Sequence, residues 1–223
     1  HRAGFLAAIS PRGNVDLDRP ITIGGKLRLL ELGLSIKRYP VCYFGHRVID
    51  GALALKAAHD LNAEDVESVE VSIGAAAAST LRNHLPGTAL EAKFSIEFDV
   101  ASALVAGNVG LAQLTDAFTN QSQMKALMQK VRVRITEQSC PLDPAFSYTD
   151  SVRITTLPGR VLDSGDIRFP KGHAMHTLSS HELRGKFLDC VTYSGLPCDG
   201  ATLYDTLLAL GELPDVSVLA NHF

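Results

Sequence analysis

Hydrophobic and polar positions along the chain follow first a helical period and then a strand period. Behind Pro40, apolar residues recur at spacings of three and four and end with a histidine: Phe44, Val48, Ala52, Leu55 and His59. This stripe predicts an amphipathic helix over residues 41–59. Over residues 69–73 valine and isoleucine alternate with polar residues, which predicts a half-buried strand.

The other predicted strands stand in the middle of the chain. The sequence VRVRI at residues 131–135 alternates and predicts a strand with one solvated face. Residues 152–156 and 160–169 lie on either side of Pro158-Gly159 and predict a hairpin. With about four strands confined to residues 66–169, we expect an α+β fold in which helices cover an antiparallel sheet.

Helices are predicted between the strands and at both ends of the chain. Ser179 with Glu182 forms a capping-box pattern and begins a helix that extends to about residue 193. Residues 74–90 are expected to be loop or short irregular pieces. The remaining predicted helices cover residues 91–106, 111–118, 121–130, 201–210 and 215–220. Helices at both ends without strands suggest pieces of a second, all-helical domain.

Composition narrows the function classes. The 223 residues are 46% hydrophobic and 20% charged, and the formal charge is −3. This balance gives no excess of positive charge that would bind nucleic acid or an anionic membrane surface. The sequence shows neither a membrane span nor a signal-peptide pattern, so we expect a cytoplasmic protein with no membrane or nucleic-acid partner. The four cysteines are far apart, without a C-x-x-C pair, and are expected to be reduced.

The candidate site residues lie just before the first predicted helix and in its first turns. Pro40 separates Lys37, expected on a turn, from the helix that carries His46 and Asp50 on one face. Lys37 and His46 are placed to converge on an anionic ligand, with Asp50 orienting the imidazole. The alternative is structural: Lys37 is a surface charge, Cys42 a small core residue, and His46 a buried histidine paired with Asp50. Spacing leaves both interpretations open.

A second group of histidines is a candidate metal site. His173 and His176 form an H-x-x-H pattern and His181 follows. This spacing on an irregular segment gives loose geometry, and no carboxylate or cysteine completes a ligand set nearby. We therefore expect solvated histidines and no metal site.

Several stretches, in this order and spacing, resemble the MmgE/PrpD family. They are KRYPVC at residues 37–42 with His46 and Ile49-Asp50 behind it, EAKFSIEFDVASALVAG at 91–107, LMQKVRV at 127–133 and KGHAMHTLSSHELRGKF at 171–187. Known activities of this family include 2-methylcitrate dehydratase, cis-aconitate decarboxylase and iminodisuccinate epimerase.

The resemblance implies a domain arrangement. Family members have a large helical domain, built from the N-terminal part and the last helices, with a smaller α+β lid inserted between them. Residues 1–32 are then the end of the helical domain, 33–178 the lid, and 179–223 the C-terminal helices. The N-terminal helical domain is expected to be missing from this chain, so that the chain alone is inactive. The resemblance also implies a homodimer.

The resemblance assigns site residues as well. Lys37 would bind a substrate carboxylate, and His46 would be an acid/base or orienting group. Cys42 and Phe98 would be substrate-binding; they stand where decarboxylase-like members have histidine and tyrosine, which argues against decarboxylation. The expected function is a lyase or isomerase, similar to 2-methylcitrate dehydratase, that moves a proton on a small di- or tricarboxylate without a cofactor. The alternative is a non-catalytic, lid-like association module with the family's fold.

Overall fold

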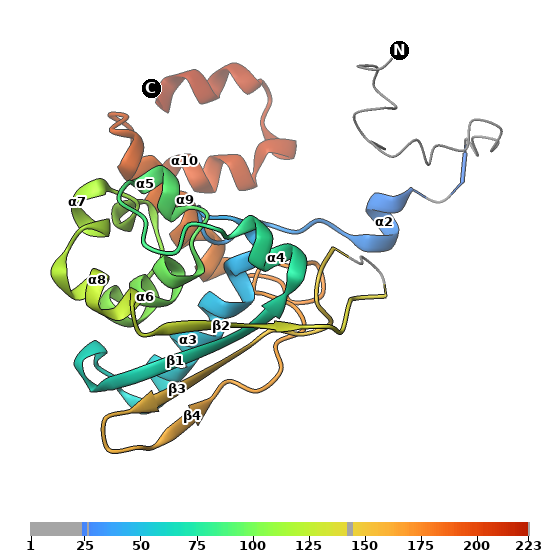
Figure 1. Ribbon diagram of the computed structural model, residues 1–223. Coiled ribbons are helices and arrows are strands. Elements are labelled where there is room, and N and C mark those ends of the chain that lie inside the picture. Colours follow the sequence, from blue (N-terminus) through green and yellow to red (C-terminus); the bar gives the residue numbers. More distant parts are fainter. Residues whose placement is uncertain (1–23, 26, 142–144, 223) are drawn as a thin grey trace, which may run out of the picture. The chain divides into compact units, whose positions relative to one another are not determined.

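The computed structural model describes residues 24–25, 27–141 and 145–222 (Figure 1). The chain divides after Leu34 into two units, which are described separately. In the first unit, helix α2, Arg28–Leu32, ends at Gly33, whose φ of 72° suits a residue without a Cβ. No helix in the described ranges is long and apolar enough to cross a membrane.

The second unit, Ser35–Phe223, is built on a four-stranded sheet of order β2-β1-β3-β4 (Figure 1). The strands are β1 Val66–Gly74, β2 Val131–Thr136, β3 Ser151–Thr156 and β4 Val161–Asp163. The α+β class, the four strands and the β3-β4 hairpin are confirmed. One pairing differs from the expected antiparallel sheet: β1 and β2 are parallel. The helices that connect them return the chain to the end of the sheet where β1 begins, as a parallel pair requires.

The helices of this unit surround and follow the sheet. Those before β2 are η1 Tyr43–Gly45, α3 His46–His59, η2 Ala63–Asp65, α4 Ala75–Thr80, α5 Ala89–Ala92, α6 Ile96–Ala106, η3 Leu111–Gln113, α7 Asp116–Thr119 and α8 Ser122–Met128. Those after β4 are α9 Ser180–Ser194, α10 Gly200–Leu208, η4 Leu210–Glu212 and η5 Val216–His222. The capping box of Ser179 and Glu182 at the start of α9 is confirmed.

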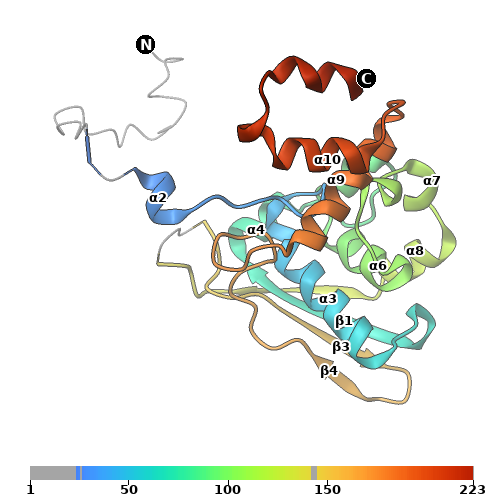
Figure 2. The same cartoon turned by 180° about the vertical axis from the view of Figure 1, so that it is seen from behind.

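Helix α3 lies along one face of the sheet (Figure 2). The apolar stripe predicted for it is largely buried, since Val48, Ala52 and Leu55 belong to the core. The helix packs tightly on the sheet at Gly51, where a Cβ would lie 3.2 Å from Cγ2 of Val152. The predicted helix over residues 41–59 is thus confirmed, with its first turn tightened into the 3₁₀ segment η1.

The region between β1 and β2 departs most from the prediction. The alanine run expected as loop forms α4, and the expected helix over residues 91–106 is two helices. Thr88 and Glu91 form a capping box that begins α5, and Ser95 accepts a hydrogen bond from the Phe98 N–H to begin α6. Gly107, in the left-handed conformation, ends α6.

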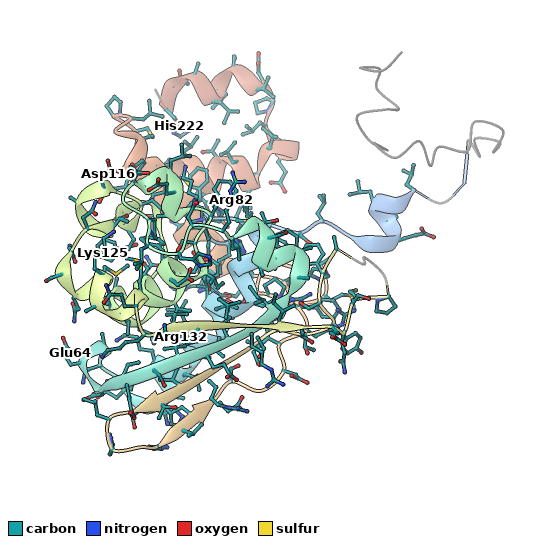
Figure 3. All side chains as sticks on the ribbon, viewed as in Figure 1. Glu64, Arg82, Asp116, Lys125, Arg132 and His222 are labelled. Atoms are coloured by element: carbon teal, nitrogen blue, oxygen red, sulfur yellow. The ribbon has the colours of Figure 1, made fainter. Side chains whose placement is uncertain are left out.

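Two polar side chains hold the helical layer together on the side of α7 and α8 (Figure 3). Asp116 accepts a hydrogen bond from the Ala89 N–H at 2.7 Å, which joins the starts of α5 and α7. Lys125 on α8 donates to the carbonyl of Pro86. The loop between α4 and α5 is therefore fixed from both sides.

Candidate functional site

His46 begins α3 and its side chain is completely buried. The ring contacts the rings of Tyr39 and Tyr43, with centroid distances of 5.1 and 4.9 Å. Neither ring nitrogen has a hydrogen-bond partner among the described residues. The imidazole is thus enclosed by aromatic rings rather than exposed at a surface.

This enclosure controls the charge of His46. Burial, helped by the positive charges of Lys37 and Lys186, lowers the pKa of its imidazole from 6.5 to about 4. The carbonyls of Val41 and Tyr39 face the ring and oppose part of the shift, although neither meets the geometry of a hydrogen bond. At neutral pH the ring is therefore uncharged and lies in a positive field.

The two lysines that act on His46 come from distant segments. Lys37 lies in the extended segment before Tyr39 and is exposed, and Lys186 lies on α9 and is half-buried. Among the described residues neither ammonium forms a hydrogen bond or an ion pair. The predicted convergence of Lys37 and His46 in space agrees with this electrostatic coupling.

Asp50 does not orient His46, contrary to the expectation from their spacing. One oxygen of Asp50 accepts a hydrogen bond from the Tyr39 hydroxyl at 2.6 Å, and the other accepts from the Lys171 N–H at 2.6 Å. These bonds anchor Tyr39, which covers the His46 ring. Burial, together with the Asp50 carboxylate, raises the pKa of the Tyr39 hydroxyl, so this hydroxyl stays protonated.

The segment that carries Lys37 is held by backbone contacts to the loop after β4. The Ile36 N–H donates to the Gly172 carbonyl at 2.7 Å, and the Ala174 N–H donates to Oγ of Ser35 at 3.2 Å. Gly172 has a φ of 89°, and a Cβ on it would lie 2.1 Å from the Ile36 carbonyl oxygen. Only glycine fits at this position.

Glu182 joins the same segments to α9. It accepts from Nη1 of Arg38 at 3.0 Å and from Nζ of Lys171 at 2.5 Å. Its other oxygen accepts from the N–H and hydroxyl of Ser179 in the capping box. The hydrogen bond from Lys171, followed by those from Ser179, lowers the pKa of Glu182 to about 2. Arg38, Lys171 and α9 are thereby fixed around one carboxylate.

Cys42 and Phe98 occupy different environments. Cys42 is half-buried, immediately before η1, and its N–H donates to the Lys93 carbonyl at 2.9 Å. Phe98 is fully buried and packs edge-to-face on Phe118. The structure gives Phe98 no surface for a ligand; its assignment as a substrate-binding residue stays a prediction and takes no part in the proposals below.

Two residues near the site were not selected from the sequence. Asp99 on α6 is fully buried, neither of its oxygens has a partner among the described residues, and burial raises the pKa of its carboxyl well above the usual value. A Cβ on Gly45 would lie 2.0 Å from its Oδ2, so Asp99 packs directly against the residue before His46. An aspartate inside the apolar run IEFDVASALVA is a signal for it; Lys186 has no comparable signal.

The histidines after β4 form no ligand set. Within residues 24–25, 27–141 and 145–222, no three histidine, cysteine, aspartate or glutamate side chains are grouped so as to hold a metal ion. His173 stacks on Phe169 with 4.5 Å between ring centroids, and His176 Nδ1 contacts the Phe169 carbonyl at 3.1 Å.

Comparison with known proteins identifies the family of the chain. No curated protein matches the chain. The profile of the MmgE/PrpD C-terminal domain, however, matches residues 39–200. The match includes all four strands and helices α3 to α9, together with His46, Glu182 and Lys186. The chain therefore belongs to the MmgE/PrpD family.

Proposed function

We propose that this chain is the C-terminal portion of a lyase or isomerase that moves a proton next to a carboxylate of a small di- or tricarboxylate. A reaction similar to that of 2-methylcitrate dehydratase is the expected form. Membership of the MmgE/PrpD family supports the class of enzyme. The observation that carries the proposal is the neutral, buried imidazole of His46 beside the unpaired ammonium of Lys37.

The charges suit a carboxylate substrate. Lys37 offers a flexible, unpaired cation at the surface, which binds a carboxylate as a point charge. When a proton leaves the neighbouring carbon, negative charge accumulates on that carboxylate, and the cation bound to it stabilises this charge. A bound anion also opposes the positive field on His46 and raises its pKa, which couples substrate binding to proton affinity at the ring.

His46 acts in this proposal as an orienting group rather than as the group that touches the substrate. Its ring is enclosed by Tyr39 and Tyr43, so a ligand reaches neither nitrogen. The residues that transfer the substrate's proton then belong to the N-terminal helical domain. In this arrangement residues 33–178 form the lid and residues 179–223 pack with the helical domain. Cys42, in place of a histidine, disfavours decarboxylation.

Lys37→Gln in the intact protein that contains this chain tests the proposal. Exchange of substrate protons into heavy water is followed by nuclear magnetic resonance for citrate-like and succinate-like acids. We expect the variant to lose at least about tenfold in exchange rate, as removal of a charged hydrogen bond predicts. Arg134→Gln, which removes an exposed charge on β2, is the control and should exchange like the wild type.

The alternative, a non-catalytic association module, makes the opposite prediction. Such a module exchanges no carbon-bound proton with any of these acids, and its self-association is unchanged by Lys37→Gln. Wild-type exchange that is unaffected by the substitution would remove Lys37 from the site.

A further inference from the structure

A pocket of about 350 Å³ opens between α9 and two loops, next to the Lys37–His46 region. Its walls come from residues 38–40, from residues 108–111 and from one face of α9. Tyr39, which contacts the His46 ring at 5.1 Å, forms part of the wall. The pocket is thus separated from His46 by a single aromatic side chain.

The pocket contains cationic donors that the protein leaves unused. Lys186 lines it without an ion pair or hydrogen bond to any described residue. Nη1 of Arg38 donates a hydrogen bond to Glu182, and the other guanidinium nitrogens of Arg38 make no hydrogen bond within the described ranges. Because a guanidinium carries five N–H donors, most of the hydrogen-bonding capacity of Arg38 stays available.

The acidic groups of the pocket do not cancel these charges. Glu182 is already shared between Arg38 and Lys171. Asp189 is exposed and lies more than 4.0 Å from every cationic nitrogen of the described residues, since it forms no ion pair with them. His181 is also exposed. The half-buried ammonium of Lys186 is therefore the cation best placed to bind an anion inside the pocket.

Gly185 leaves the necessary space. It stands within α9 and lines the pocket, and a Cβ built on it meets no atom within 4 Å. Glycine inside a helix is unfavourable relative to alanine, so the glycine that leaves this space open lowers the stability of α9. The empty volume lies beside Lys186, in the next position of the same helix.

We propose that Lys186, with Arg38, forms a second carboxylate-binding subsite, so that the ligand is a small polycarboxylate held by Lys37 at one carboxylate and by Lys186 at another. This inference rests on the proposed function and extends it from one carboxylate to two. Arg38, the residue next to Lys37, lines the pocket together with Lys186, so the two subsites are neighbours.

Calorimetric titration of the 223-residue chain with tricarballylate, succinate and acetate tests the subsite. We expect saturable binding of tricarballylate and a loss of roughly ten- to hundredfold in its affinity for Lys186→Gln. Lys186→Arg should retain most of the binding. Acetate, which has one carboxylate and does not bridge the two lysines, should bind much more weakly than tricarballylate, and Arg134→Gln serves as the charge-matched control.

Gly185→Ala provides a variant that keeps the charge and improves the helix. It should raise the melting temperature and still weaken tricarballylate binding, because the added methyl group occupies the pocket. If Lys37→Gln weakens binding and Lys186→Gln does not, the second subsite is wrong and the proposed function stands. Absence of saturable tricarballylate binding to the wild type overturns the subsite, whereas the proposed function is decided separately by proton exchange in the intact protein. Phosphate binding as tightly as tricarballylate, with the same dependence on Lys186, overturns the assignment to carboxylates.

Discussion

Replacement of His46 by phenylalanine should remove an acid-induced loss of stability. The folded protein holds the imidazole with a pKa of about 4, whereas the unfolded chain has the ordinary value of 6.5. As the pH falls through this window, the unfolded state binds a proton and the folded state does not. The free energy of unfolding therefore decreases as the pH is lowered, by up to about 1.4 kcal/mol per pH unit.

The magnitude follows from the difference between the two pKa values. A shift from 6.5 to about 4 corresponds to about 3 kcal/mol in total. Between about pH 7 and about pH 4.5, roughly 2.5 kcal/mol of this loss should appear. Two buried carboxyl groups act in the opposite direction: burial raises the pKa of Asp150 to about 6 and that of Asp99 well above its usual value, so both favour the folded state in acid.

Because of these opposing groups, the pH dependence of wild-type stability alone does not give the contribution of His46. The assay is urea unfolding of the wild type and of His46→Phe at several pH values, with the difference between them as the readout. The difference in stability at neutral pH is the baseline, and the expected signal is the change of about 2.5 kcal/mol in that difference on acidification. Exposed His181→Gln is the control. A difference that stays constant with pH would refute an enclosed, neutral imidazole.

Three further substitutions test the surroundings of the site. Gly45→Ala should destabilise the fold by about 1–3 kcal/mol in urea unfolding, because the new Cβ overlaps Oδ2 of Asp99, and Asp99→Ala should relieve part of this loss. Asp99→Asn should gain stability relative to the wild type as the pH rises above about 4, with a slope of at most about 1.4 kcal/mol per pH unit, since only the unfolded carboxyl ionises there. Ser179→Ala should cost about 1 kcal/mol through loss of the α9 cap, measured by thermal unfolding.

Local patterns predicted the elements whose stabilising contacts lie close in sequence. The stripe of α3, the alternation in β1 and the capping box of α9 each depend on residues within a few positions of one another. The parallel pairing of β1 with β2 depends on the path of the whole helical connection, which no window of sequence contains. The expected helix over residues 91–106 is divided where Ser95, inside the periodic segment, caps α6, and α5 begins at Thr88, just outside that segment.

The candidate site shows the same limit. The assignment of Lys37 and His46 to one site stays a prediction, but the pairing of His46 with Asp50, inferred from a spacing of four, is wrong. Tyr39 and the Lys171 N–H compete for that carboxylate and satisfy both of its oxygens. A helical spacing brings two side chains to one face; it does not exclude partners that the tertiary fold brings to the same group.

The position of Glu182 has a consequence for the expected boundary between lid and C-terminal helices at residues 178 and 179. Arg38 and Lys171 lie on one side of this boundary, and Glu182, which binds both, lies on the other. A movement of α9 away from residues 33–178 would break both ion pairs and separate Lys186 from Lys37. The two proposed carboxylate subsites therefore exist together only while α9 is docked. A ligand that bridges them binds the docked arrangement and not the separated one, and so stabilises the docked arrangement.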